Sequence, residues 1–467
     1  MKTAHPITTR FALITLAVAL AGCASTPMES QRYQPTLANN FANAPATPAE
    51  PVSEFWRAFN DADLDALMAQ ALKANADLRI ASANLQEARA LARFSDAQGM
   101  PRIDGTASAA RVRGRDGQGR ADTGSAFAVG FDVAWEADLF GRVSNDRQAA
   151  AATVLAGEAG LRSAQVSVAA ELARNYFELR GFQEQLRVAQ ASLETQQAAL
   201  KLTQARQSVG RGTLLDSERA NALVQTTAAN VPALESSVTR SRYRIAVLTG
   251  QVPAALDALL AQPKPLPGFK AVPLGAIGSP ESLLRRRPDV AAAEAQIAAA
   301  AARVGVARSD LFPRITLGGS LGLNAGRISE LGNSSSFAYN LGANLLWSLL
   351  DFGRIRSQIA ASEARSDGAL AQYEKTVLGA LEETEGALAN YTRVQQQSDR
   401  LFAAEQSAAK AAEIARSRFS VGVSDFLAVL DAERELLAAR DRLAQVQTAA
   451  ATSLVAVYKA LAGGWAP

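Results

Sequence analysis

The chain contains the same unit twice. Short motifs recur at a single offset of 212 residues, so that a motif at position 101 returns at position 313. The matches run along most of one unit: Pro101-Arg102-Ile103 with Pro313-Arg314-Ile315, Trp135 with Trp347, Phe140-Gly141-Arg142 with Phe352-Gly353-Arg354, and Ser208-Val209-Gly210 with Ser420-Val421-Gly422. Because a duplicated unit folds in the same way in both copies, each copy should contain the same elements in the same order.

Each copy contains segments with the alternation of β-strands. From Phe127 to Trp135, large apolar residues occupy every second position, and small or polar residues lie between them. A period of two residues indicates a strand with one apolar and one polar face. The second copy alternates in two segments: Ile315, Leu317, Leu321 and Leu323, then Phe337, Tyr339, Leu341, Leu345 and Trp347. A fourth strand is predicted at 102–112, and polar loops at 113–124 and 325–336 are predicted to connect the strands in pairs.

The segments on either side of the strands have helical character. An alanine-rich helix is predicted from Leu64 to about Gln98, and a proline three residues later ends it. No proline lies between 141 and 208, where leucines at 172, 179, 186, 193 and 200 recur every seven residues. A continuous helix of this span is ~100 Å long. The chain then turns and returns in a second helix, which Pro232 is expected to kink. The second copy repeats this hairpin at 353–420 and 425–461.

These elements combine into a membrane protein with both α and β structure. An apolar outer face and a small, polar inner face are typical of transmembrane barrel strands. Four strands cannot close a barrel, and lipid does not tolerate open strand edges. Closure therefore needs several chains, and three would give twelve strands around an aqueous lumen. Because each strand pair joins helices at one end only, the predicted fold is a β-barrel closed by several chains, twelve-stranded if trimeric, and continued by a long α-helical barrel.

Histidine and cysteine are almost absent. The chain has one of each, His5 and Cys23, both near the N-terminus. This scarcity excludes Ser-His-Asp triads, Cys-His dyads, His-ligated zinc or haem, internal disulfides and thiolate clusters. Lysine and arginine number 48 against 45 aspartate and glutamate, and this near balance argues against nucleic acid as a partner. We therefore expect no enzyme activity, no metal and no cofactor.

The N-terminus has the features of a bacterial lipoprotein signal. Two basic residues precede an apolar stretch from Phe11 to Ala21, which is too short to span a bilayer. It ends in Leu-Ala-Gly-Cys at 20–23, which resembles a lipobox. The resemblance implies cleavage after residue 22, a covalent lipid on Cys23 and, with Ala24 in the next position, the outer membrane. The proline-rich segment that follows is interpreted as a tether.

Several motifs together resemble one family of outer-membrane proteins. They lie at 56–59 (WRAF), 230–235 (NVPALE), 248–250 (LTG), 283–290 (LLRRRPDV), 307–313 (ARSDLFP) and 458–465 (YKALAGGW). Over essentially its whole mature length the chain is similar to TolC-type outer-membrane efflux factors, lipoprotein (NodT-like) subgroup. The resemblance implies a homotrimer in outer-membrane lipid that passively conducts drugs or other small solutes to the exterior. It also implies a periplasmic adaptor, a proton-driven inner-membrane pump and a long periplasmic extension.

The duplication and the resemblance together predict the domain boundaries. They divide the chain into a signal peptide (1–22), an acylated tether (23–60), a first repeat (61–250, with a strand pair at about 101–140 and a helix hairpin at 141–250), an equatorial linker (251–279) and a second repeat (280–467, with a strand pair at about 313–350, a helix hairpin at 351–462 and a short tail).

The turn between the last two helices resembles the family's gate segment, SVGVSDFLAVLD at 420–431. By position, Leu427 corresponds to an apolar ring and Asp431 to an acidic ring around the threefold axis, with Asp425 nearby. Three apolar side chains can narrow a pore, and three carboxylates attract cations. On the plainer interpretation, Asp425 caps the last helix and Asp431 lies on a solvated face. Some relatives carry an arginine and an acid where this chain has Ser424 and Ala428, so a latch of that type is not indicated.

The resemblance also places adaptor docking at the hairpin turns. The residues concerned are Val209, Gly210, Arg211, Val421 and Gly422. On the plainer interpretation, the glycines are present only to let the chain turn. Two further motifs are interpreted structurally: the arginines at 285–287 serve helix ends, and Asp-Phe-Gly at 351–353 begins a helix.

Two other functions fit parts of the sequence. A channel of an ATP-driven protein or peptide secretion system would have the same architecture. A lipid-anchored periplasmic coiled-coil scaffold would use the leucine pattern but would have no membrane-spanning strands, and the alternation of the predicted strands argues against it.

Overall fold

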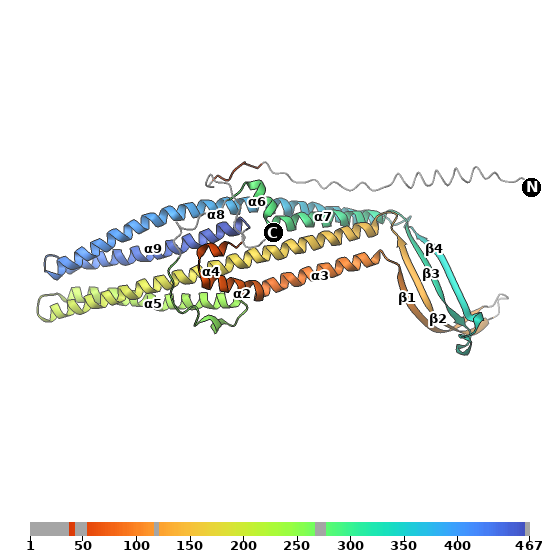
Figure 1. Cartoon of the computed structure of the whole chain (residues 1–467), viewed down its shortest axis with the longest axis horizontal. Coiled ribbons are helices and arrows are strands. Elements are labelled where there is room, and N and C mark those ends of the chain that lie inside the picture. The colour runs from red at the N-terminus through yellow and green to blue at the C-terminus, as the bar shows by residue number, and fades with distance from the viewer. Residues whose placement is uncertain (1–36, 43–53, 116–120, 267–276, 463–467) are drawn as a thin grey trace, which may run out of the picture. The chain divides into compact units, whose positions relative to one another are not determined.

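The computed structural model describes residues 37–42, 54–115, 121–266 and 277–462. Figure 1 shows the order of the elements. The helices and strands are α2 (Ala62–Ala74), α3 (Ala76–Gln98), β1 (Arg102–Arg115), β2 (Ala121–Ala137), α4 (Arg142–Ser208), α5 (Leu214–Leu248), α6 (Pro280–Arg286), α7 (Pro288–Ser309), β3 (Arg314–Ala325), β4 (Phe337–Leu346), α8 (Arg354–Ser420) and α9 (Phe426–Ala460). Short 3₁₀ helices are η1 (Phe55–Phe59), η2 (Pro253–Leu256), η4 (Ile328–Glu330) and η5 (Ser334–Ser336).

The described residues form two compact units. The sheet unit contains Leu85–Gly157 and Ala292–Glu374, and therefore holds all four strands. The hairpin unit contains the described residues of Pro35–Asn84, Glu158–Ala291 and Lys375–Pro467. The helices α4 and α8 each begin in the sheet unit and end in the hairpin unit. The predicted signal peptide and Cys23 lie outside the described residues, as does most of the tether.

The sheet unit contains one antiparallel sheet with the strand order β1-β2-β3-β4. The register places Phe131 of β2 opposite Gly105 of β1 and Leu321 of β3, and Leu321 lies opposite Tyr339 of β4. Large apolar side chains gather on this face, which we call the outer face, and they are largely exposed. The other face, the inner face, carries small or polar residues such as Gly130. The four strands and their predicted alternation are confirmed.

The strands are longer than the sequence indicated. The predicted loop at 113–124 is wrong, because β1 continues to Arg115 and β2 begins at Ala121. Arg113 pairs with Thr123, and Val112 with Gly124, within the hairpin ladder. Backbone pairing across the hairpin has overridden a glycine-rich, charged composition that disfavours strands.

The duplication is preserved down to single hydrogen bonds. Arg102 lies opposite Ala134 in the first strand pair, and Arg314 lies opposite Leu346 in the second, so both pairs have the same register. The Nε1 of Trp135 donates to the carbonyl oxygen of Gly99 at 3.0 Å. Its counterpart makes the equivalent bond, from Trp347 Nε1 to the Leu311 carbonyl oxygen at 3.1 Å. The two copies are therefore structural equivalents as well as sequence repeats.

The helix hairpins are also confirmed. α4 and α8 have 67 residues each, and α5 and α9 have 35 each. Of the predicted leucine series, Leu172 and Leu179 are fully buried in the core of the hairpin unit. Pro232 lies inside α5, which continues through it as one helix.

The predicted single helix from 64 to 98 is wrong, because it is interrupted at Asn75. This side chain accepts from the backbone N–H of Asp77 at 2.8 Å and donates to the carbonyl oxygen of Leu248 at 2.9 Å. It thereby caps α3 and satisfies the end of α5. A partner 173 residues away in the chain fixes this break.

Candidate functional site

The turn after α4 is built around a glycine. Gly210 has φ +71°, a left-handed conformation that suits a residue without Cβ. Its N–H donates to the Gln207 carbonyl oxygen at 3.0 Å, and the N–H of Arg211 donates to that of Arg206 at 2.8 Å. These two bonds form a Schellman motif, which satisfies carbonyl groups at the helix end.

The turn after α8 has the same geometry. Gly422 has φ +80°, and its N–H donates to the Phe419 carbonyl oxygen at 3.0 Å. The valines before the two glycines, Val209 and Val421, are 68% and 72% exposed. The glycines therefore let the chain turn, as the plainer interpretation predicts, and each turn leaves an apolar side chain exposed.

The first two turns of α9 divide into a buried and an exposed face. Asp425 caps the helix, accepting from the N–H of Ala428 at 3.1 Å. Leu427 and Asp431, four residues apart on one side of the helix, are both exposed. Phe426, Val429 and Leu430 are buried with Ala220 of α5. The geometry therefore keeps the two proposed gate residues off the core.

Arg206 connects the two hairpins at their ends. Its Nη2 donates to the carbonyl oxygens of Phe419 and Ser420 at 3.2 and 3.3 Å, at the end of α8. Its guanidinium carbon also lies 4.1 Å from the centre of the Phe419 ring, a cation–π contact. A cation at the C-terminus of a helix is favoured by the helix dipole. One side chain of α4 thus holds the turn of the other hairpin.

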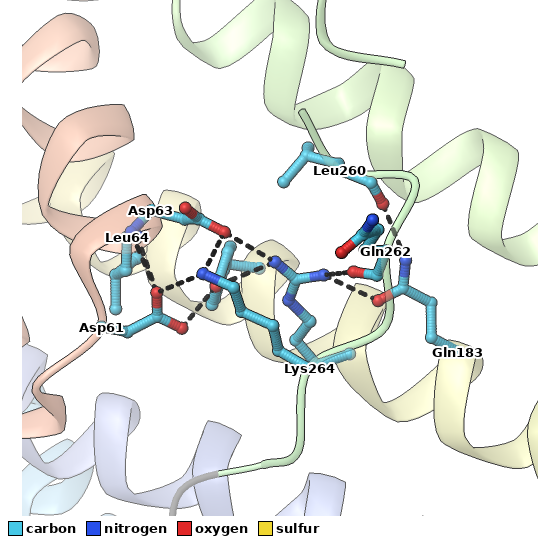
Figure 2. Close-up of polar contacts among 9 residues, drawn as sticks. Asp61, Asp63, Leu64, Gln183, Leu260, Gln262 and Lys264 are labelled. Carbon is cyan, nitrogen blue, oxygen red and sulfur yellow. Dashed lines mark hydrogen bonds and ion pairs between the residues drawn. The ribbon is translucent and has the colours of Figure 1, made fainter. Parts of the chain in front are cut away.

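A second polar cluster lies within the hairpin unit and is shown in Figure 2. Arg180 of α4 is 1% exposed. Its Nη1 donates to the Gln262 carbonyl oxygen at 2.8 Å and to Gln183 at 2.9 Å, while its Nη2 donates to Asp63 at 3.2 Å. Gln183 in turn donates to the Leu260 carbonyl oxygen at 2.8 Å. The buried guanidinium therefore fastens the segment after η2 to α4.

The charge of Arg180 is balanced by residues at the start of α2. Lys264 lies 2.5 Å from Asp63 and 3.7 Å from Asp61. The hydroxyl of Tyr176 donates to Asp61 at 2.5 Å. Burial and that hydrogen bond raise the pKa of Tyr176 far above its ordinary value, so the hydroxyl stays a donor. Two carboxylates thus face two cations in a neutral cluster.

The second repeat has an arginine at the position that corresponds to Asn75 of the first repeat. Arg287 stands where the first repeat has Asn75, and its Nη1 donates to the Ala460 carbonyl oxygen at 2.8 Å, at the end of α9. It also pairs with Asp289 and Glu383, each at 2.8 Å. The predicted role of this arginine at a helix end is confirmed.

The helix start predicted for 351–353 is confirmed as well, because Asp351 accepts from the N–H groups of Gly353 and Ile355.

The charge network around Glu383 is sensitive to acid. Burial opposes ionisation of this carboxyl, but the hydrogen bonds from Lys459 and Arg287 outweigh it and hold the pKa below its ordinary value. Ionised Glu383 therefore stabilises the fold at neutral pH. This contribution is lost as the pH falls through the lowered folded-state pKa.

Comparison with known proteins gives consistent matches along the whole chain. The family model described as "Outer membrane efflux protein" matches residues 67–251 and 279–463. The chain therefore belongs to the outer membrane efflux protein family.

Relatives and solved structures agree with this assignment. The pyoverdine export outer membrane protein OpmQ of Pseudomonas aeruginosa is 31% identical over 463 residues, covering 97% of this chain and 96% of that protein. The solvent efflux pump outer membrane protein SrpC of Pseudomonas putida is 34% identical over 433 residues, covering 90% and 88%. The solved structure of the outer-membrane channel OprN superimposes with a TM-score of 0.88 at 39% identity, covering 93% of this chain and 98% of that one.

This family member is an outer-membrane efflux channel, as the sequence predicted. Proteins of the outer membrane efflux protein family are channels rather than enzymes. The scaffold alternative predicts that the chain has no membrane-spanning strands. A sheet whose apolar outer face is exposed disagrees with that prediction. Leu427, Asp431, Asp425, Val209, Gly210, Arg211, Val421 and Gly422 all lie in the hairpin unit, at the hairpin ends.

Two functional candidates were missed by sequence reasoning, Arg180 and Arg206. Both lie within long helices where an arginine reads as a surface residue. For Arg206, the position four residues before Gly210 was the available signal, since cations are common in the last turn of a helix. For Arg180 no pattern pointed to burial, because two of its partners, Gln262 and Asp63, lie 82 and 117 residues away in the chain.

Replacing Arg180 should loosen the segment after η2. In Arg180→Met, Asp63 loses one buried partner and the Gln262 carbonyl group loses its donor. Gln183, which donates to the Leu260 carbonyl group, loses the hydrogen bond that orients it. We expect a loss of about 3 kcal/mol of stability and faster amide hydrogen exchange over residues 260–264. The matched control is Arg174→Met on the same helix, where the arginine is half exposed and forms an ion pair with Glu178. Equal exchange in the two variants would contradict the fastening role.

Proposed function

We propose that three copies of this chain close one barrel of twelve strands across the outer membrane. The observation that carries the proposal is a sheet with an exposed apolar outer face, a small inner face and two open edges, β1 and β4. Lipid offers no partners for the backbone groups of such edges. Joining edge to edge satisfies them. Two copies would give eight strands, a barrel that side chains fill, whereas twelve strands lined by small residues leave a lumen.

The duplication supports a particular register for this joint. Within one chain, β2 of the first repeat pairs with β3 of the second, with Val133 opposite Gly319. The joint between copies brings together the equivalent strands, β4 of one copy and β1 of the next. The repeat offset of 212, between positions 101 and 313, relates Val133 to Leu345 and Gly319 to Ala107. The equivalent pair at the joint is therefore Leu345 of one copy opposite Ala107 of the neighbouring copy.

A second pair of residues at the joint supports the same arrangement. Phe140 stacks on Phe312 within one chain, with ring centres 4.8 Å apart and planes 6° apart. The repeat counterpart of Phe140 is Phe352, which is 99% exposed despite its size. The counterpart of Phe312 is Met100, which is 64% exposed. In the proposed trimer these two exposed side chains pack against each other across the joint.

The register can be tested with paired cysteines. Ala107→Cys with Leu345→Cys should form a disulfide-linked trimer on oxidation in the outer membrane, because directly opposed residues lie within bonding range. The control pairs Ala109→Cys with Leu345→Cys, which shifts the partner by two residues. Band sizes in non-reducing gels report the result. Linkage of the control pair alone would refute the register, and no linkage of either pair would refute the joint.

The closed tube is proposed to conduct solutes passively for an inner-membrane pump, through a periplasmic adaptor. The relatives' names support a conduit without strong selectivity of its own: at similar identities they refer to pyoverdine export, solvent efflux and, for CusC of Escherichia coli, cation efflux. We propose drugs or other small solutes as cargo and a proton-driven pump as the partner. Covalent lipid on Cys23 would add a membrane anchor beside the barrel, and neither a metal nor another cofactor enters this mechanism.

The hairpin ends are proposed as the gate. Leu427 and Asp431 share the exposed face of α9, and three copies of each would form an apolar and an acidic ring. Asp425 fixes the start of α9 and so the position of both. The contact from Arg206 to the end of α8 keeps the two hairpins together. Some relatives have an arginine and an acid that could form a latch where this chain has the uncharged Ser424 and Ala428. In this chain the contact from Arg206 takes the place of that latch.

Loosening these ends should make the closed channel leak. Leu427→Ala widens the apolar ring, Asp431→Ser removes the acidic ring, and Arg206→Met releases the tie between hairpins. Each is expected to raise the closed-state conductance of the purified channel in planar bilayers several-fold. Lys201→Met, an exposed cation earlier on α4, is the control. Unchanged conductance in all three variants would argue against a gate at this end.

Docking of the adaptor is proposed at the two turns, through Val209, Gly210, Arg211, Val421 and Gly422. A photo-crosslinker on Val421→Cys should capture a periplasmic adaptor in living cells, which mass spectrometry would identify. The control is Val252→Cys, a position that is equally exposed at 72%. An adaptor of an ATP-driven exporter would indicate secretion instead of solute efflux, and equal capture from both positions would refute specific docking.

A further inference from the structure

The apolar outer face of the first strand pair ends in two arginines. Arg111 and Arg113 of β1 lie on the same face as Phe127, opposite Ser125 and Thr123 of β2. Both arginine side chains are exposed. These four residues, Arg111, Arg113, Ser125 and Thr123, offer two guanidinium groups and two hydroxyls and no carboxylate.

The position of these arginines along the strands is informative. The apolar band of β2 runs from Trp135 to Phe127, which is about 27 Å along the strand and accounts for most of a tilted membrane crossing. Arg111 and Arg113 lie beyond its far end, next to the β1–β2 connection. The helices join the strands at the other end, so the arginines lie on the extracellular side. A charged side chain on the lipid-facing side is strongly unfavourable at the bilayer centre but is tolerated near the interface.

The proposed trimer adds a third group to this cluster, and this step rests on the proposed function. The register of β2 and β3 places Phe127 opposite Ala325. By the repeat offset, Phe127 corresponds to Tyr339 and Ala325 corresponds to Arg113. The equivalent register at the joint therefore places Tyr339 of one copy opposite Arg113 of the next. Tyr339 is 77% exposed within its own chain. Its ring can lie against the guanidinium, and its hydroxyl adds a further donor at the joint.

We infer that this cluster binds the phosphate group of an outer-leaflet glycolipid, of the lipid A class. Arginine forks bind phosphate oxygens in pairs, and the surrounding hydroxyls can donate to the remaining oxygens. The lipid-facing side of the barrel admits acyl chains along the apolar band below the arginines. A phosphorylated lipid therefore fits both the charge at the membrane surface and the apolar surface beneath it. The site would be made of β1 and β2 of one copy with Tyr339 of its neighbour.

The test is lipid retention by the full-length, detergent-purified protein in native mass spectrometry. The probe is diphosphoryl lipid A, compared with lipid A from which both phosphates have been removed. We expect the wild-type assembly to retain the phosphorylated form, and Arg111→Gln/Arg113→Gln to bind it about tenfold more weakly. Tyr339→Phe should weaken binding to a lesser extent. The matched control is Arg327→Gln, an exposed arginine in the β3–β4 connection that is paired with Glu330.

The outcomes separate this inference from the proposed function. Equal retention by the wild type and the double variant, or equal retention of the phosphate-free lipid, would overturn it. Displacement of the lipid by millimolar inorganic phosphate would overturn the assignment to a lipid headgroup. Unchanged binding in Tyr339→Phe would overturn the role of the Tyr339 hydroxyl in the site. The same spectra give the mass of the assembly, so a failure to form trimers, which refutes the proposed function, is seen independently of lipid binding.

Discussion

The backbone groups along the free edges of β1 and β4 set the main constraint on this protein. A four-stranded sheet with an apolar outer face belongs in lipid, yet lipid leaves those N–H and C=O groups without partners. Only another strand can satisfy them, and the internal duplication provides a matching one. In the assembly that we propose, the contact of β2 with β3 inside one chain is the template for the contact between chains. The proposed barrel, its register and the packing of the otherwise exposed Phe352 follow from that contact.

The two repeats are equivalent in backbone but differ where they carry charge. Asn75 and Arg287 occupy matching positions and donate to matching helix ends, the Leu248 and Ala460 carbonyl groups. The arginine additionally gathers a charge network around Glu383. Conversely, Arg180 has a threonine, Thr392, at the matching position of the second repeat. Each repeat thus has its own polar cluster within the hairpin unit, and only the first fastens the segment after η2.

The hairpin ends have the features that the proposed gate requires, a fixed helix start and side chains left free of the core. Phe426, Val429 and Leu430 anchor α9 in a small apolar cluster, while Leu427 and Asp431 face away from it. The tie from Arg206 consists of one part-buried and one exposed hydrogen bond and one ring contact. Such contacts are individually modest in energy. A partner bound at the adjacent turns could break them without unfolding the core.

The sequence alone determined a large part of this protein. A period of two residues shows which face of a strand is apolar, and a period of seven shows which face of a helix is apolar. The strands, their outer faces and the long helices could therefore be predicted. The offset of 212 residues between positions 101 and 313 revealed the duplication, and the motifs gave the family. The tertiary structure decided the rest: the break at Asn75, the length of β1 and β2, the burial of Arg180 and the tie made by Arg206. The reason is physical, because each depends on hydrogen-bond partners from other segments of the chain. Local patterns report the exposure of a residue's own element but do not specify which distant carbonyl or carboxylate the fold brings beside it.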